Sequence, residues 1–319
     1  MKAIVRLLLC GLLAMVGLAN AQPYPSKPVQ VVVPFPPGGS SDVIARLIGT
    51  KLSEALKQNF ITDNRPGAGT LIGTTYVAKA APDGYTLLLA DVPFTVNPTV
   101  LPNANYDPVK DFTPITMVGA SAQFLYANPT RFKLLSELLA AAKAKPGQVT
   151  VATAGNGTTT HLMTAMLEAG AGVKFIQVPY KGSAPALNDA AAGHVDAAFS
   201  TLASAASLVR SGKLRVIGVT ALQRLPAFPD VPTFVEAGVQ DLVVEHWWGM
   251  LGPAGVPGDV VQKLQAEIAK AVGAPDVRER FGALGVEPRS STSEQFREVI
   301  QSYVTRWTRV VKEHNIKVD

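Results

Sequence analysis

Short β-branched runs alternate with longer segments of helical period along most of this chain of 319 residues. This alternation is typical of βαβ units built around mainly parallel sheets, and it predicts an α/β fold. Strands are predicted at 30–33, 85–90, 149–152, 173–178, 195–199 and 214–219. Helices are predicted at 42–57, 71–79, 134–144, 160–168, 184–192, 259–272 and 293–312.

Two of the predicted strands run into a glycine-rich turn that is followed by a helix. The first leads into Pro36-Pro37-Gly38-Gly39-Ser40-Ser41, and the second leads into Gly155-Asn156-Gly157-Thr158-Thr159. In an open α/β sheet such turns lie at the carboxyl ends of strands, where ligands bind, and the bare N–H groups of the next helix favour anions. Each turn alone fits a simple helix cap equally well, because hydroxyl and carboxylate side chains satisfy first-turn N–H groups. Two such turns facing one another would form a cleft for an acid.

The first 21 residues have the pattern of a secretory signal peptide. Lys2 and Arg6 precede an apolar run at 7–19, and Ala19-Asn20-Ala21 is a small-x-small cleavage site. We expect cleavage after Ala21 and export to the periplasm. A membrane anchor fits less well, because a bilayer span needs about 20 apolar residues. Lipid attachment at Cys10 also fits less well, because Leu9 stands where that modification needs a small residue.

The remaining 298 residues suit two domains or one large one. Cys10 is the one cysteine, so the mature chain would hold neither a disulfide nor a thiol. The chain has 29 basic and 24 acidic residues, and two of the basic ones lie in the signal, which leaves 27 − 24 = +3. These charges are scattered, so nucleic acid is not an expected partner. No later apolar stretch predicts a membrane span.

Motifs of common enzyme classes are missing from the sequence. There is no G-x-S-x-G elbow, phosphate-binding loop or H-E-x-x-H motif, and the four histidines are dispersed. The run 67–73 differs from a dinucleotide fingerprint by one residue and follows Arg65-Pro66 instead of a strand. We therefore expect no enzymatic activity, no cofactor and no metal.

A series of short motifs follows in a fixed order along the chain. They are 34–42 with Ala45-Arg46, 64–69 with 72–74, 82–87, 111–115, 179–182, 230–234, and Trp248-Gly249 with 253–257. In this order they resemble the substrate-binding proteins of tripartite tricarboxylate transporters, the Bug family, over the whole mature chain.

This resemblance implies a type II periplasmic binding protein fold, with two Rossmann-like lobes around a central cleft. Lobe 1 would be discontinuous, comprising 22–122 and 248–319, and lobe 2 would comprise 123–247, with crossings near 119–123 and 245–248. In the family, backbone groups and ordered waters from the two turns hold a ligand carboxylate, without an arginine clamp. Carried over to this chain, the ligand-binding residues are Phe35, Gly39, Ser40, Ser41, Ala154, Gly155 and Thr158, with Asn156 from the same turn.

Two acidic residues are further candidates for ligand contact. Asp42 resembles the acid that faces a ligand amino group in some relatives, but it could equally be a carboxylate that stabilises its own helix N-terminus. Asp91 follows a strand where many relatives carry a small or hydroxyl residue. If it faces the cleft, it should bind a hydrogen-bond donor and disfavour a second ligand carboxylate.

Four other side chains are candidates with structural alternatives. His161 lies in the first turn of its helix, where a structural hydrogen bond is the favoured interpretation over ligand contact. Tyr180, Phe199 and Ser200 could form cleft walls or pack in the core. Trp247 and Trp248 are expected to pack near the crossover.

The resemblance therefore implies a periplasmic receptor that captures a small carboxylic acid by hinge closure and presents it to membrane permease subunits. We expect a monomer. An exported ligand sensor for a signalling partner, or a secreted enzyme of unknown type, is the alternative, since a fold alone does not separate these functions.

Overall fold

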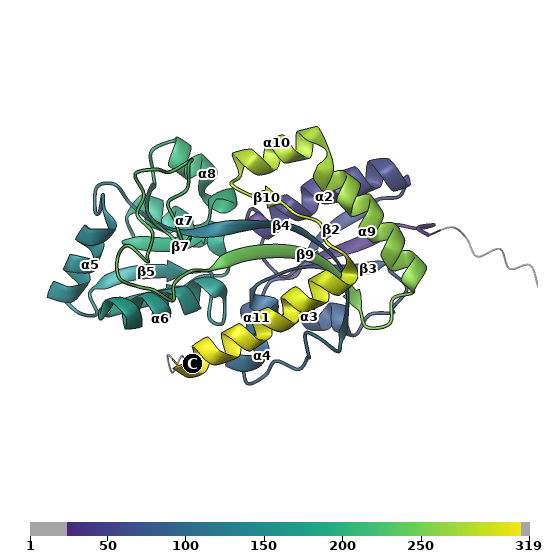
Figure 1. The fold of residues 1–319 in the computed structure, drawn as a ribbon, viewed down its shortest axis with the longest axis horizontal. Coiled ribbons are helices and arrows are strands. Elements are labelled where there is room, and N and C mark those ends of the chain that lie inside the picture. Colours follow the sequence, from purple (N-terminus) through teal and green to yellow (C-terminus); the bar gives the residue numbers. More distant parts are fainter. Residues whose placement is uncertain (1–23, 314–319) are drawn as a thin grey trace, which may run out of the picture.

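The computed structural model describes residues 24–313 (Figure 1). The predicted signal peptide lies outside the described residues. Within 24–313, no helix has both the length and the apolar character that a bilayer crossing needs. The α/β prediction is confirmed, because helices and strands alternate along most of this range.

The first sheet is built mainly from the N-terminal part of the chain. Its strand order is β2-β1-β3-β9-β4, in which β1, β2 and β3 are parallel and β9 is antiparallel to both of its neighbours. The strands are β1 (Val29–Val33), β2 (Phe60–Asn64), β3 (Thr86–Asp91), β4 (Phe112–Ala127) and β9 (Glu245–Pro253), with the short β10 (Glu287–Pro288) paired to β4. The helices associated with this part are α2 (Ser40–Leu56), η1 (Ala68–Thr70), α3 (Leu71–Ala78), α4 (Pro93–Val100), α9 (Gly258–Gly273), α10 (Pro275–Ala283) and α11 (Ser293–Glu313).

The second sheet also contains three parallel strands, and helices connect these strands. Its order is β8-β4-β7-β5-β6, and β4 is antiparallel to both β7 and β8. The strands are β5 (Val149–Thr153), β6 (Phe175–Pro179), β7 (Ala197–Thr201) and β8 (Arg215–Val219). The helices are α5 (Leu135–Ala144), α6 (Thr159–Ala171), α7 (Ser183–Ala192) and α8 (Leu202–Arg210).

Strand β4 belongs to both sheets. Its residues 112–122 pair with β9, and its residues 123–127 pair with β7. β4 and β9 therefore lie side by side where the two halves of the molecule meet (Figure 1). The pairing partner of β4 changes from β9 to β7 between Ala122 and Gln123. The division of the chain into two lobes at 122/123 and 247/248 stays a prediction.

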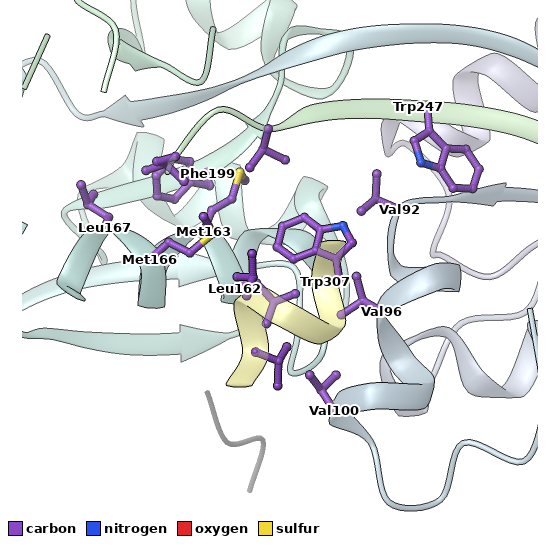
Figure 2. Packing of buried hydrophobic residues seen from close by; sticks show 14 of the residues in the cluster. Val92, Val96, Val100, Leu162, Met163, Met166, Leu167, Phe199, Trp247 and Trp307 are labelled. Carbon is purple, nitrogen blue, oxygen red and sulfur yellow. The ribbon is translucent and has the colours of Figure 1, made fainter. Parts of the chain in front are cut away.

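Helix α11 contributes to a core cluster that includes residues of both halves. The Trp307 side chain is fully buried between valines of α4, including Val96, and Leu162 of α6 (Figure 2). Burial of a large aromatic side chain stabilises a fold by about 1.5 to 3 kcal/mol. Trp307 of the C-terminal helix thus belongs to a core that includes residues of both α4 and α6.

Candidate ligand-binding site

Five helices begin at a small cavity between the two sheets. The cavity measures about 40 Å³. One wall comes from the start of α2, with Gly39, Ser40 and Ser41, and the facing wall comes from the start of α6, with Thr158, Thr159 and Thr160. The starts of α4, α7 and α8 complete the lining with Pro93, residues 182–185 and Thr201. We call this space the inner cavity.

Neither α2 nor α6 has a side-chain cap. Gly39 and Thr158 occupy the two N-cap positions, and neither residue caps a first-turn backbone N–H with a side chain. The Thr158 hydroxyl donates instead to the Gly155 carbonyl at 2.6 Å. First-turn N–H groups have no acceptor inside their own helix, and the helix dipole adds about half a positive charge at this end. The inner cavity is therefore electrostatically suited to an anion.

Several buried polar atoms at this cavity have no hydrogen-bond partner within residues 24–313. They are Gln123 Oε1, Thr159 Oγ1, Thr201 Oγ1 and His246 Nε2. An unpaired buried polar atom costs about 1 to 3 kcal/mol, so such atoms are rare without a functional reason. Their concentration around one cavity indicates a site built to pair them with a ligand.

The described residues that line the inner cavity include no lysine and no arginine. Asp91 and His246 are the two that can ionise. Asp91 ends β3 and is 3% exposed, and its Oδ2 accepts a hydrogen bond from Ser41 Oγ at 2.8 Å. Trp248 Nε1 donates to the same Ser41 oxygen at 3.1 Å. An anion bound here would be held by neutral donors, as the resemblance implies.

A wider cavity of about 580 Å³ adjoins the inner one. Both are lined by Phe35, Pro36, Ala154, Thr158 and Gly182, so they share a wall. The remaining lining of this outer cavity includes 66–70 from the first half and 179–181 from the second. Among the described residues that line the outer cavity, Lys181 is the one with a basic side chain.

Most of the site residues predicted from sequence come together here. Those at the inner cavity are Phe35, Gly39, Ser40, Ser41, Asp91, Ala154 and Thr158, and those at the outer cavity also include Gly155, Asn156 and Tyr180. The Tyr180 hydroxyl donates to Asp189 at 2.5 Å. Burial and this bond raise the pKa of Tyr180 to about 12.

Asp42 does not line either cavity, and its carboxylate is bonded to the preceding turn, to its own helix and to β2. It accepts hydrogen bonds from Gly38 N at 3.0 Å, from Arg46 Nε at 3.1 Å and from Asn64 Nδ2 at 3.0 Å. Burial alone would raise the pKa of Asp42, but the bonds from Arg46, Gly38 and Asn64 outweigh it and lower the pKa. These contacts occupy the Asp42 carboxylate, and both of its proposed roles stay predictions.

His161, Phe199 and Ser200 also lie outside the lining of both cavities. His161 Nδ1 accepts a hydrogen bond from Gly157 N at 3.3 Å, and burial lowers the His161 pKa. Phe199 packs against Phe234 with ring centroids 5.5 Å apart, and Ser200 is buried beside it in β7. Trp247 and Trp248 are fully buried on β9, near the point where β4 changes sheets.

Sequence reasoning missed the two cavity residues on the strands that link the halves, Gln123 on β4 and His246 on β9. It also missed Thr159, Thr160, Thr201 and 182–185. Thr159 belongs to the predicted glycine turn and could have been included from that signal. His246 stands two residues before the Trp248-Gly249 motif, but a single histidine gives no local indication of a cleft.

Comparison with known proteins identifies the family. A family model described as the tripartite tricarboxylate transporter family receptor matches residues 44–316. The protein BugT of Bordetella pertussis is 37% identical over 313 residues, which cover 96% of each chain.

Two solved structures from Rhodopseudomonas palustris superpose on the chain. One was solved with adipate, with a TM-score of 0.88 and 32% identity over 92% of this chain and 99% of the other. The other is MatC with bound malate, with a TM-score of 0.86 and 33% identity over 90% of this chain and all of the other, 100%. The predicted two-lobe binding-protein fold is confirmed, and these relatives are receptors, not enzymes. The chain belongs to the Bug family, the substrate-binding receptors of tripartite tricarboxylate transporters.

Proposed function

We propose that this protein captures a small carboxylic acid, with the ligand carboxylate in the inner cavity. The observation that carries the proposal is the convergence of uncapped helix starts on unpaired buried polar atoms. Hydrogen bonds from N–H groups to an ionised oxygen are about twice as strong as neutral ones. Several of them, with two helix dipoles, can hold a carboxylate without a basic side chain. The structures of relatives with adipate and malate support the same ligand class.

The two cavities suggest how the ligand is oriented. A water molecule needs about 10 to 15 Å³ of cavity space, so the inner cavity of about 40 Å³ has room for a carboxylate and little more. The rest of the ligand would extend into the outer cavity, past Phe35 and Gly182. A chain of a few carbons fits this arrangement.

Contacts across the cleft indicate a closed receptor. Ser40 N of α2 donates to Ser204 Oγ of α8 at 2.9 Å. Gly182 approaches Pro36 so closely that a Cβ atom there would lie 3.0 Å from the proline ring. Ligand capture would thus require the halves to separate and close again about the strands β4 and β9.

The proposed biological role is uptake from the periplasm. The signal-peptide pattern at 1–21 and the family of transporter receptors support it. We propose that the closed, loaded monomer delivers its acid to the membrane permease subunits of a tripartite tricarboxylate-type transporter.

A thermal-shift screen tests the ligand class. Each acid should be compared with its methyl ester, which keeps the carbon chain and removes the charge. At 100 times its dissociation constant, a bound acid stabilises the folded state by about 2.7 kcal/mol. We expect a shift with an acid and none with its ester. Equal shifts with both, or none with any acid, would contradict carboxylate capture.

A further inference from the structure

Asp91 and His246 face one another at the inner cavity without touching. The distance between Asp91 Oδ2 and His246 Nε2 is 3.6 Å, which is too long for a hydrogen bond. Both side chains are more than nine-tenths buried, and both residues line the cavity. Two atoms 3.6 Å apart have no room for a third atom between them, but one polar atom in the cavity beside them can contact both.

The hydrogen-bond network fixes Asp91 as an acceptor. An indole N–H can only donate, so the Ser41 oxygen accepts from Trp248. The single Ser41 proton is then directed to Asp91 Oδ2. This arrangement suits an ionised carboxylate, whose oxygens accept only.

The same reasoning fixes His246 as a donor. Its Nδ1 lies 3.0 Å from Gln123 Nε2, and an amide nitrogen donates but does not accept. With the Gln123 amide in this orientation, Nδ1 accepts and Nε2 carries an N–H. Nε2 has no hydrogen-bond partner among the described residues.

A hydroxyl group beside this acceptor and this donor can pair with both, because it can donate one hydrogen bond and accept another. We propose that the inner cavity selects carboxylic acids with a hydroxyl near the carboxylate, the hydroxyl donating to Asp91 and accepting from His246. This inference rests on the proposed function. Ser41 lies in the first turn of α2, where we propose that the ligand carboxylate binds, and its side-chain hydroxyl binds Asp91. The ligand carboxylate and the ligand hydroxyl would therefore lie close together. The hydroxyl would therefore be on the second or third carbon.

Other ligand groups match the pair less well. An ammonium group donates to Asp91 but offers no acceptor to the His246 N–H. A second carboxylate accepts from His246 but places a negative charge beside Asp91. A methyl group leaves both side chains without a ligand partner. The pair therefore discriminates among acids of the same length.

Calorimetric titration of the purified protein tests this selection. The probes are propionate, butyrate and valerate, each with its 2-hydroxy, 3-hydroxy and 2-amino derivatives, together with succinate. The variants are Asp91→Asn and His246→Gln. Their matched controls are Asp107→Asn and His194→Gln, which change partly exposed side chains that line neither cavity. Thermal denaturation without ligand shows whether each variant is folded.

One hydrogen bond to a charged group changes affinity by about tenfold or more, so we expect at least one hydroxy acid to bind about tenfold tighter than its parent acid. In Asp91→Asn and His246→Gln this ratio should fall below about threefold, whatever the change in affinity for the parent acid. The two controls should keep the ratio of the unmodified protein.

Three results would overturn the inference and leave carboxylate capture intact. They are equal binding of hydroxy and parent acids, tighter binding of an amino or dicarboxylic acid, and equal weakening of all acids in both variants. Equal binding would mean that a water takes the place beside Asp91 and His246. Absence of binding by every probe would overturn the proposed function and this inference together.

Discussion

Ser40 and Ser204 are joined across the cleft, with the Ser40 backbone N–H donating to the Ser204 hydroxyl at 2.9 Å. The two residues are 164 positions apart and lie on α2 and α8, which are associated with different sheets. Ser40 also lines that cavity, whereas Ser204 does not. This bond links closure of the two halves to the place where we propose that the ligand carboxylate binds.

Removal of this link should weaken the closed state. A neutral hydrogen bond contributes about 0.5 to 1.5 kcal/mol, so Ser204→Ala should raise the dissociation constant by about twofold to tenfold. The loss should be mainly in the dissociation rate, because opening becomes easier. Stopped-flow titration measures both rates. The control is Ser207→Ala on the exposed side of α8. An unchanged dissociation rate in Ser204→Ala would show that this hydrogen bond does not stabilise the closed state.

A side chain at Gly39 should block the ligand without harming the fold. Gly39 has φ −78°, which any residue can adopt, and a Cβ atom there would have only ordinary contacts, at 4.0 Å or more. We expect Gly39→Leu to abolish binding and to keep the melting temperature. Gly155 is less suitable for this test, because its φ of +124° strains any other residue. Calorimetry showing unchanged affinity in Gly39→Leu would place the ligand elsewhere.

Asp196 should make stability depend on pH in a specific direction. Its carboxylate accepts from Arg131 Nη2 at 2.6 Å and from Thr150 N at 2.9 Å. Burial alone would raise the pKa of Asp196, but the bonds from Thr150 and Arg131 outweigh it and lower the pKa.

Because the folded pKa lies below the unfolded value of about 3.9, the stabilisation is complete above that pH and is lost as the pH falls through the folded pKa. Asp196→Asn should therefore lower the free energy of unfolding by about 1.5 to 3 kcal/mol at pH 7. The difference from the unmodified protein should shrink below about pH 4. Urea denaturation across this range measures it, with Asp241→Asn, at an exposed aspartate, as the control. A difference that persists undiminished at low pH would contradict the assignment.

The parts of the fold that the sequence predicted are those with local signals. Strands β1 and β5 are rich in β-branched residues and precede a glycine turn, and helices α9 and α11 are long, with apolar residues that recur at helical spacing. The helix α4 was missed because it begins with Pro93 and contains Pro98. Strand β4 was missed because Pro114 and Gly119 interrupt its 16 residues.

The site residues, too, were predicted only where the sequence has a local signal. The two glycine turns were predicted because turns at strand ends carry a local pattern. Gln123 and His246 were not, because they meet only through the antiparallel pairing of β4 with β9, which sets Ser121 opposite His246. Pairing between segments more than 100 residues apart leaves no pattern at either one.

The central claim is that the starts of α2 and α6 hold the ligand carboxylate, and a crystal structure of the protein with the acid that binds tightest tests it most directly. We predict carboxylate oxygens in the inner cavity, within about 3.2 Å of first-turn N–H groups near Ser41 and Thr159, or one water away. A carboxylate bound at Lys181 in the outer cavity, with the inner cavity holding the apolar end of the ligand, would contradict this account.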